Sequence, residues 1–214
     1  GSPLGLTSTD CVPSKAMIAT GAAFGEFSDA GAMGLTVELP AVELGLLKDR
    51  ITSIVGRLER SVRVQLESQG VRMIKGSGRL TGPHTVEATT ADGAVETIEA
   101  DAILVSTGSR PRVPDFATPD GDRILTTRDM YPPPEMPSHL IVIGSGVTGV
   151  EFVHMFSSFG AEVTLVVSRQ QVLPQKDPEV AAVLEADFLR RGVRLLKGAR
   201  ATAVERTDDG VAVQ

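Results

Sequence analysis

The sequence predicts an α/β fold in two domains, with parallel sheets, crossover helices and β-hairpins. Its 214 residues are 42% hydrophobic and 22% charged, a composition that can bury a core. A proline-rich stretch over 110–137 has the composition of a linker, so we place a domain boundary inside it. Beyond that stretch, strand and helix patterns alternate, which is typical of a parallel sheet with crossover helices.

The residues that open the chain predict two helices. One is expected over 13–20, with Pro13 in its first turn, and the glycine-rich segment 21–39 is expected to be irregular. A long helix is expected over 41–69, because apolar residues recur there every three or four positions. These residues are Leu44, Leu47, Ile51, Ile54, Val55, Leu58, Val62 and Leu66.

The remainder of the first half predicts strands. "VRMIKGSG", at 71–78, predicts a short strand followed by a turn. The alternating pattern over 84–100 predicts a hairpin that turns at Asp92-Gly93. "DAILVSTGSRPRVP", at 101–114, predicts an apolar strand that leads into a glycine- and proline-rich exit.

The second half predicts an alternating series of elements. Strands are expected over 139–143, 162–167 and 193–196, with helices over 147–159 and 178–191. The last residues predict a hairpin that turns at Asp209-Gly210. Because the sequence stops just after that turn, we expect it to be part of a longer protein.

Charge and cysteine content argue against several functions. A net charge of -6 and a pI near 5.1 argue against a nucleic-acid surface. No apolar run reaches the roughly 18 residues of a membrane helix. Cys11 is the single cysteine, which excludes an internal disulfide framework and suits a reducing, cytoplasmic setting. We expect no metal site.

A glycine motif marks the start of the predicted helix 147–159. "HLIVIGSGVTGVEF" places Gly144, Gly146 and Gly149 in G-x-G-x-x-G spacing, with a strand before the motif and a helix after it. In this context the first glycine permits a tight turn, the second a close approach to pyrophosphate, and the third close packing of helix and strand. We interpret the motif as a dinucleotide site, with an ordinary glycine-rich turn as the alternative.

The end of the next predicted strand bears on nucleotide preference. A NAD site usually carries Asp or Glu there to bind the ribose 2′-hydroxyl. The sequence instead reads Val167, Ser168, Arg169, and Arg169 is suited to pair with a 2′-phosphate. This favours NADP, with a solvated loop charge as the alternative for Arg169.

Cys11 stands near the start of the first predicted helix. A helix N-terminus favours the thiolate form of a cysteine, and Lys15, four positions later, lies on the same helix face. The alternative is a small buried hydrophobic residue.

Taken together, "CVPSK", "ILVSTGSRP" and "IVIGSGVTGVEF" resemble motifs of the flavoprotein disulfide reductases, also called pyridine nucleotide-disulfide oxidoreductases. That family includes dihydrolipoamide dehydrogenase and glutathione reductase. The resemblance implies two Rossmann-like dinucleotide-binding domains: an incomplete FAD domain over 1–118 and a nearly complete NAD(P) domain over 119–214. It further implies FAD in the full-length protein, which we do not expect this chain alone to retain, and a homodimer formed through a C-terminal domain beyond this chain.

The resemblance also implies roles for individual residues. Cys11 matches the second cysteine of the family's C-x-x-x-x-C pair, and Lys15 matches a lysine beside flavin N5 that pairs with the glutamate at Glu151; surface charges are the alternative for that pair. The remaining matches are implied cofactor contacts. They are Gly78 near adenine, Thr107 and Gly108 at the flavin, and Val147 and Thr148 within the glycine motif.

One departure from the family pattern bears on function. Leu6 stands where the first redox cysteine of the pair is expected. In this respect the chain is similar to lipoamide-dehydrogenase-like NAD(P)H:quinone reductases that lack one redox cysteine. We therefore expect an FAD-dependent oxidoreductase that takes hydride from NAD(P)H and reduces a small, quinone-like acceptor. The alternatives are a dihydrolipoamide or disulfide oxidoreductase and a non-enzymatic nucleotide-binding or redox-sensing module.

Overall fold

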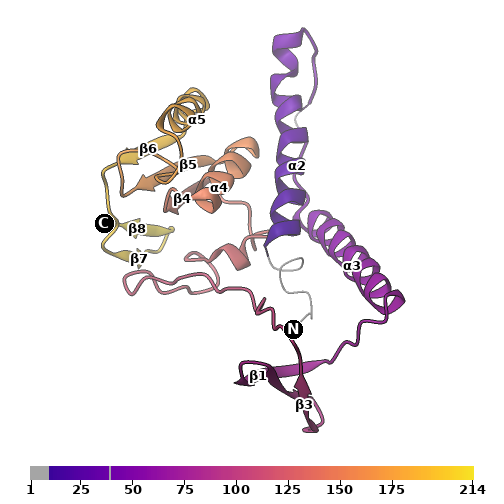
Figure 1. Ribbon diagram of the computed structural model, residues 1–214. Helices are drawn as coiled ribbons and strands as arrows, with labels where there is room; N and C mark the ends of the chain where they lie inside the picture. The colour runs from indigo at the N-terminus through magenta and orange to yellow at the C-terminus, as the bar shows by residue number, and fades with distance from the viewer. Residues whose placement is uncertain (1–9, 39) are drawn as a thin grey trace.

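The computed structural model describes residues 10–38 and 40–214, so Leu6 lies outside the described residues. Figure 1 shows three regions: two helices, α2 and α3, a small sheet β1–β3, and a part that contains β4–β6 with α4 and α5. We call residues 139–197 the α/β unit. The mixed fold with a parallel sheet and antiparallel hairpins confirms the predicted fold class.

Helix α2 spans Cys11–Asp29 and is followed by a 3-10 turn, η1, at Ala30–Met33. The prediction of a helix over 13–20 with irregular structure after it was therefore wrong in its C-terminal boundary. Gly21 is buried where α2 crosses α4, and a Cβ added there would lie 3.3 Å from Ser158 Cβ. This glycine permits close packing of two helices and does not interrupt α2, because tertiary contacts override its low helix propensity.

Helix α3 spans Leu44–Ser68, which confirms the predicted long helix. It ends in a Schellman motif at Gly70, whose φ is 72°. The Gly70 N–H donates to Glu67 O, and the Val71 N–H donates to Leu66 O, both at 3.0 Å. Of its apolar face, Leu47 and Ile51 are buried, whereas later positions such as Leu58 are exposed.

Strands β1 (Gly76–Gly82), β2 (Thr85–Thr90) and β3 (Val95–Glu99) form an antiparallel sheet in that order. The turn between β2 and β3 confirms the hairpin at Asp92-Gly93. The strand expected at the start of 71–78 begins only at Gly76, where a turn was expected. Gly76 lies so close to β2 that an added Cβ would be 2.1 Å from Thr89 O. The absence of a side chain at this position therefore permits β1 to pair with β2.

The apolar strand expected within 101–114 is not present. Within the described part of the chain no strand pairs with this segment, and Leu104 is 91% exposed. A run of β-favouring residues becomes a strand only when neighbouring strands accept its backbone hydrogen bonds. The apolar pattern of this segment was therefore not sufficient to predict a strand.

The α/β unit confirms all five elements predicted for it. Strands β4 (His139–Ile143), β5 (Glu162–Val167) and β6 (Arg194–Lys197) are parallel and adjacent in that order, connected by helices α4 (Val147–Ser158) and α5 (Pro178–Arg190). Helix α5 begins at Pro178, after Asp177 accepts the Glu179 N–H at 2.8 Å. One core joins the unit to α2, with Met17, Met155, Phe156, Leu165 and Phe188 fully buried.

The predicted C-terminal hairpin is also present, as β7 (Val204–Arg206) and β8 (Val211–Val213). It contacts the proline-rich linker, which contains the 3-10 turn η2 at Thr127–Asp129. The Val204 N–H donates to Phe116 O at 3.1 Å, and the Arg206 guanidinium bonds Asp120 and Asp122. The linker is therefore fixed against the hairpin. Among the described residues, no helix has both the length and the hydropathy needed to cross a bilayer.

Candidate functional site

Cys11 is the first residue of α2, and its thiol is free and exposed. The N-cap, Asp10, makes no side-chain capping bond, although its carbonyl accepts the Ser14 N–H at 2.9 Å. The first N–H groups of any helix lack partners within that helix, and they favour negative charge. The structure thus places Cys11 at a helix N-terminus, as predicted, and excludes the alternative of a buried hydrophobic residue.

Lys15 and Glu151 are brought together across 136 positions of sequence. Lys15 lies on α2 and Glu151 on α4, and the Lys15 Nζ donates to Glu151 Oε1 in an ion pair. The two helices pack together, because Met17 is fully buried in the core that α2 shares with α4 and Gly21 allows their close approach. The Lys15 side chain is 64% exposed and that of Glu151 29%, so the pair is accessible to a ligand.

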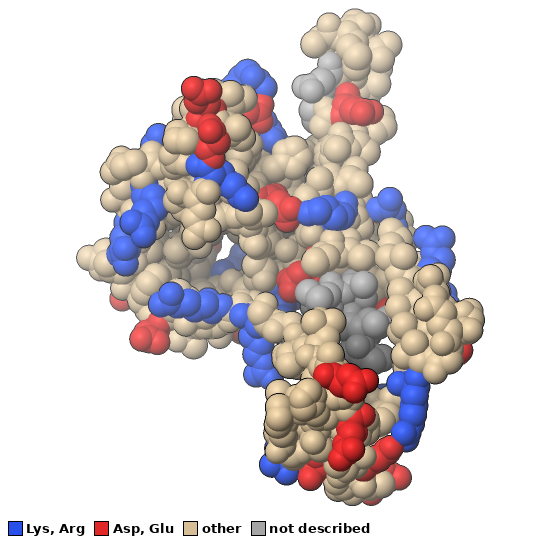
Figure 2. Space-filling model, in the orientation of Figure 1, with Lys and Arg blue, Asp and Glu red and all other residues tan. Residues whose placement is uncertain are grey.

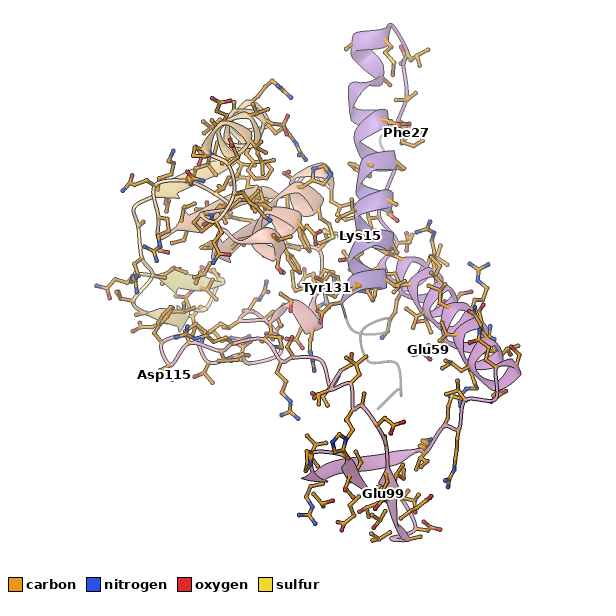
Figure 3. The ribbon with its side chains drawn as sticks, viewed as in Figure 1. Lys15, Phe27, Glu59, Glu99, Asp115 and Tyr131 are labelled. Carbon is orange, nitrogen blue, oxygen red and sulfur yellow. The ribbon has the colours of Figure 1, made fainter. Side chains whose placement is uncertain are left out.

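Tyr131 lies beside this pair and was missed by the sequence analysis. Figure 3 shows Tyr131 close to Lys15 in this view. The Tyr131 ring packs on Phe152, the neighbour of Glu151 in sequence, with centroids 5.4 Å apart. Burial raises the pKa of Tyr131, and the negative charges of Asp10, Glu151 and Cys11 raise it further. Its one distinguishing signal in the sequence is that it is the chain's single tyrosine, which belongs to no motif.

The glycine motif forms a tight turn between β4 and α4. Gly144 has φ 115° and donates its N–H to Val166 O at 3.1 Å. A Cβ at Gly149 would lie 1.9 Å from Gly144 O, so α4 packs closer to the turn than any other residue would allow. Gly146, the N-cap, provides no side chain to bind the free N–H groups of the helix, and an added Cβ there would meet open space.

Val147 and Thr148, the first two residues of α4, are exposed beside this turn. Their N–H groups belong to the set that has no partner within a helix, so they point toward the space in front of Gly146. An anion placed there would receive these N–H groups and the positive end of the helix dipole. The turn therefore fits a nucleotide pyrophosphate.

Ser168 and Arg169 follow β5 and are exposed at the same edge of the sheet as the glycine turn. This follows from the parallel pairing of β4 with β5, which brings their carboxyl ends together. The Gly198 N–H, after β6, donates to Arg169 O at 3.0 Å. Figure 2 shows basic and acidic side chains interspersed on the face in view. Phosphate binding would therefore depend on the glycine turn and on Arg169.

The three other predicted cofactor contacts lie outside α2 and α4. Gly78 is in β1, which Figure 1 shows apart from α2 and α4. Thr107 and Gly108 are exposed in the segment that forms no strand, and Gly108 has φ 72°. Among the described residues, no group of three or more His, Cys, Asp or Glu side chains could hold a metal ion.

Comparison with known proteins identifies the family. Residues 5–214 match the family model described as pyridine nucleotide-disulphide oxidoreductase. The chain is 42% identical over 212 residues to a protein named NAD(P)H dehydrogenase (quinone) from Mycobacterium tuberculosis, covering 95% of the chain and 43% of that relative. It is 34% identical over 204 residues to a dihydrolipoyl dehydrogenase of Zymomonas mobilis, covering 95% of the chain and 44% of the relative.

Solved structures agree with this assignment. The crystal structure of LpdA from Mycobacterium tuberculosis matches with a TM-score of 0.85 at 42% identity, over 97% of this chain and 46% of that one. The HOCl-induced flavoprotein disulfide reductase RclA from Escherichia coli has the same fold, with a TM-score of 0.76 at 20% identity, over 97% of this chain and 43% of that one.

The chain spans less than half the length of these relatives. Members of the family that it matches are oxidoreductases that depend on FAD and NAD(P)H. The resemblance inferred from the three sequence motifs is thereby confirmed, and the chain belongs to the pyridine nucleotide-disulphide oxidoreductase family.

Proposed function

We propose that the full-length protein is an FAD-dependent oxidoreductase that takes hydride from NAD(P)H and passes electrons to a small, quinone-like acceptor. The observation that carries this proposal is the lone Cys11 beside the Lys15–Glu151 ion pair. Thiol–disulfide exchange needs a second thiol within reach, and Leu6 replaces the matching cysteine in the sequence. The 42% identity to a protein named NAD(P)H dehydrogenase (quinone) supports the same choice of acceptor.

In this proposal the glycine turn holds the nucleotide. Gly146, Val147 and Thr148 offer N–H groups to the pyrophosphate, while Gly144 and Gly149 allow helix and turn to approach. Ser168 and Arg169 face the adenosine ribose, and the lack of a carboxylate there favours NADPH over NADH.

The flavin, when bound, supplies the carrier that accepts a hydride and releases electrons to the acceptor. In our proposal the Lys15 ammonium presents positive charge to it, and Glu151 orients that ammonium by accepting its hydrogen bond. Cys11, exposed at the start of α2, provides a thiol group at the same place. Gly78, Thr107 and Gly108 remain proposed FAD contacts.

The test is steady-state turnover of full-length protein with NADPH and a quinone. Lys15→Met is expected to lower kcat by at least about 10-fold, because it removes a charge aimed at the reacting cofactor. Lys48→Met, at an exposed lysine of α3, is the matched control and should leave kcat unchanged.

Cys11→Ser should keep most of the quinone reduction, because hydride transfer would not pass through sulfur. A loss of about 100-fold or more, equivalent to about 2.7 kcal/mol of barrier, would show that Cys11 is an obligatory redox carrier and would contradict the proposal.

The second candidate is dihydrolipoamide or disulfide oxidoreduction, favoured by the identity to dihydrolipoyl dehydrogenases. Turnover with dihydrolipoamide would support it, and its absence alongside quinone turnover would support the first. The third candidate is a redox sensor without turnover, which the exposed Cys11 favours. We further propose a cytoplasmic location, a homodimer formed through a further domain, and a boundary between FAD and NAD(P) domains near residue 118.

A further inference from the structure

The loop that carries Arg169 is fixed at three places. We define it as the β5–α5 loop, residues 168–176. The Leu173 N–H donates to Ser145 O at 2.7 Å, which fastens the loop to the glycine turn. The Gly198 N–H donates to Arg169 O at 3.0 Å, which fastens the start of the loop to the end of β6.

The third fixed place is Glu185, on α5. Its Oε1 accepts the Val172 N–H at 2.8 Å, and its Oε2 accepts Lys197 Nζ at 2.8 Å. The Glu185 side chain is only 12% exposed, and a charge that is buried to this extent needs partners. The two donors compensate it. Val172 itself is fully buried, and a shift of Glu185 would therefore move the loop backbone.

Leu173, next to Val172, has an unusual backbone. Its φ is 48°, and it is the one non-glycine residue with a positive φ among those described. Residues held in this region are strained and persist where neighbours over-determine them. Here the Val172 N–H donates to Glu185 and the Leu173 N–H donates to Ser145 O, so two successive peptides are fixed.

We propose that Glu185 is a positioning residue for nucleotide binding, which acts through Val172 and Leu173 on the glycine turn and on Arg169. The inference rests on the proposed function, because it assumes that the turn and Arg169 bind a pyridine nucleotide. The two hydrogen-bond partners of Glu185, the Val172 N–H and Lys197 Nζ, are not among the nucleotide-facing groups. It holds in register the two parts of the site that must bind one ligand at once: the pyrophosphate turn and the end of β5.

The ion pair between Glu185 and Lys197 also bears on which nucleotide is bound. This lysine is the last residue of the edge strand β6 and would otherwise add a second cation close to Arg169. Its pairing with Glu185 compensates that charge, so discrimination between a 2′-phosphate and a 2′-hydroxyl would depend on Arg169.

The test uses two substitutions at one position. Glu185→Gln keeps an oxygen that accepts the Val172 N–H, whereas Glu185→Leu has a similar size and no acceptor. The dissociation constant for NADPH is measured by nicotinamide fluorescence, on this chain and on the full-length protein. Glu162→Gln, at an exposed glutamate at the opposite end of β5, is the matched control.

We expect Glu185→Leu to raise the NADPH dissociation constant by at least about 10-fold (1.4 kcal/mol) and Glu185→Gln by less than about 3-fold. In the full-length protein the loss should appear as a raised KM for NADPH with kcat unchanged. Amide hydrogen exchange at Val172 and Leu173 should speed up together in Glu185→Leu. If that variant fails to fold, Glu185→Ala takes its place in the same measurements.

Two results distinguish failure of the proposed function from failure of the role proposed for Glu185. If the wild-type full-length protein binds neither NADPH nor NADH, the proposed function fails. If it binds NADPH and the acceptor-free variants, folded by circular dichroism, bind within about 2-fold of wild type, the proposed function stands and the role of Glu185 is wrong.

Discussion

The α/β unit and the segment 101–114 differ in how far the local sequence pattern determines the structure. In the α/β unit each strand pairs with a strand that is next to it in the sequence, separated by one crossover connection, as β4 pairs with β5. The segment 101–114 also contains an apolar run, at 102–105, yet it forms no strand and leaves Leu104 exposed. The comparison shows that an apolar β pattern predicts a strand only where its partners are supplied.

The largest expected effect tests this contrast at two leucines that sequence analysis treats alike. Leu165, in β5, is fully buried, whereas Leu104 is 91% exposed. Leu165→Ala should lower the free energy of unfolding by about 3–5 kcal/mol, because it leaves a cavity. Leu104→Ala should change it by less than about 0.5 kcal/mol. Urea unfolding of this chain checks both, and equal costs would abolish the distinction.

The next effect concerns a glycine that sets close packing. Gly149→Ala places a Cβ 1.9 Å from Gly144 O, so the turn must shift. We expect a loss of about 1–3 kcal/mol of stability and at least a 10-fold weaker NADPH affinity. Gly25→Ala, in α2, is the matched control, because nothing lies within 4 Å of the new Cβ. It should stabilise by up to about 1 kcal/mol through helix propensity.

A smaller, pH-dependent effect is expected at His154, on α4. Burial lowers its pKa below the ordinary value of 6.5, and the Arg191 guanidinium, which donates to His154 Nδ1 at 2.9 Å, lowers it further. The unfolded chain therefore binds the proton more readily, and stability should fall as the pH drops below about 6.5. His154→Gln should flatten the dependence of the urea midpoint between pH 7.5 and 5.5.

The matched control for this pH effect lies in the small sheet. Glu96 pairs with Arg72, and the hydrogen bond from Arg72 lowers the pKa of the carboxylate below its usual 4.5. Glu96→Gln should therefore leave the slope between pH 7.5 and 5.5 unchanged. If His154→Gln behaves the same way, another group causes the acid sensitivity.

The smallest effect is spectroscopic. Tyr131 is the single tyrosine and the chain has no tryptophan, so tyrosinate absorbance reports Tyr131 alone. Burial is the largest cause of its raised pKa, and the Glu151 charge adds to it. Glu151→Gln should therefore lower the titration midpoint while leaving it above 10. Glu162→Gln is the control, and an unchanged midpoint in Glu151→Gln would place Glu151 too far away to matter.

Sequence analysis predicted most of the fold and part of the site. The elements from His139 onward were predictable, because hydrophobic period and glycine spacing are local signals. The Lys15–Glu151 contact was expected only through family resemblance, since no local pattern connects positions 136 apart.

The misses share one physical cause. Helix α2 continues past Gly21 because α4 packs on it, and β1 begins at Gly76 because β2 approaches it closely. Tyr131 and Glu185 belong to no motif, and their surroundings are formed by segments distant in sequence. Such residues are defined by tertiary contacts, which a single sequence does not display.

The crossing of α2 and α4 also has a consequence for biosynthesis. At about 5–20 residues per second, roughly 7–27 s separate the synthesis of Lys15 from that of Glu151. During that interval Met17 has no partner from α4, so the apolar face of α2 stays accessible to chaperones or to other nascent chains. Contacts of this sequence separation also slow folding. Helix α2, which carries Cys11, is thus synthesised well before the helix on which it packs.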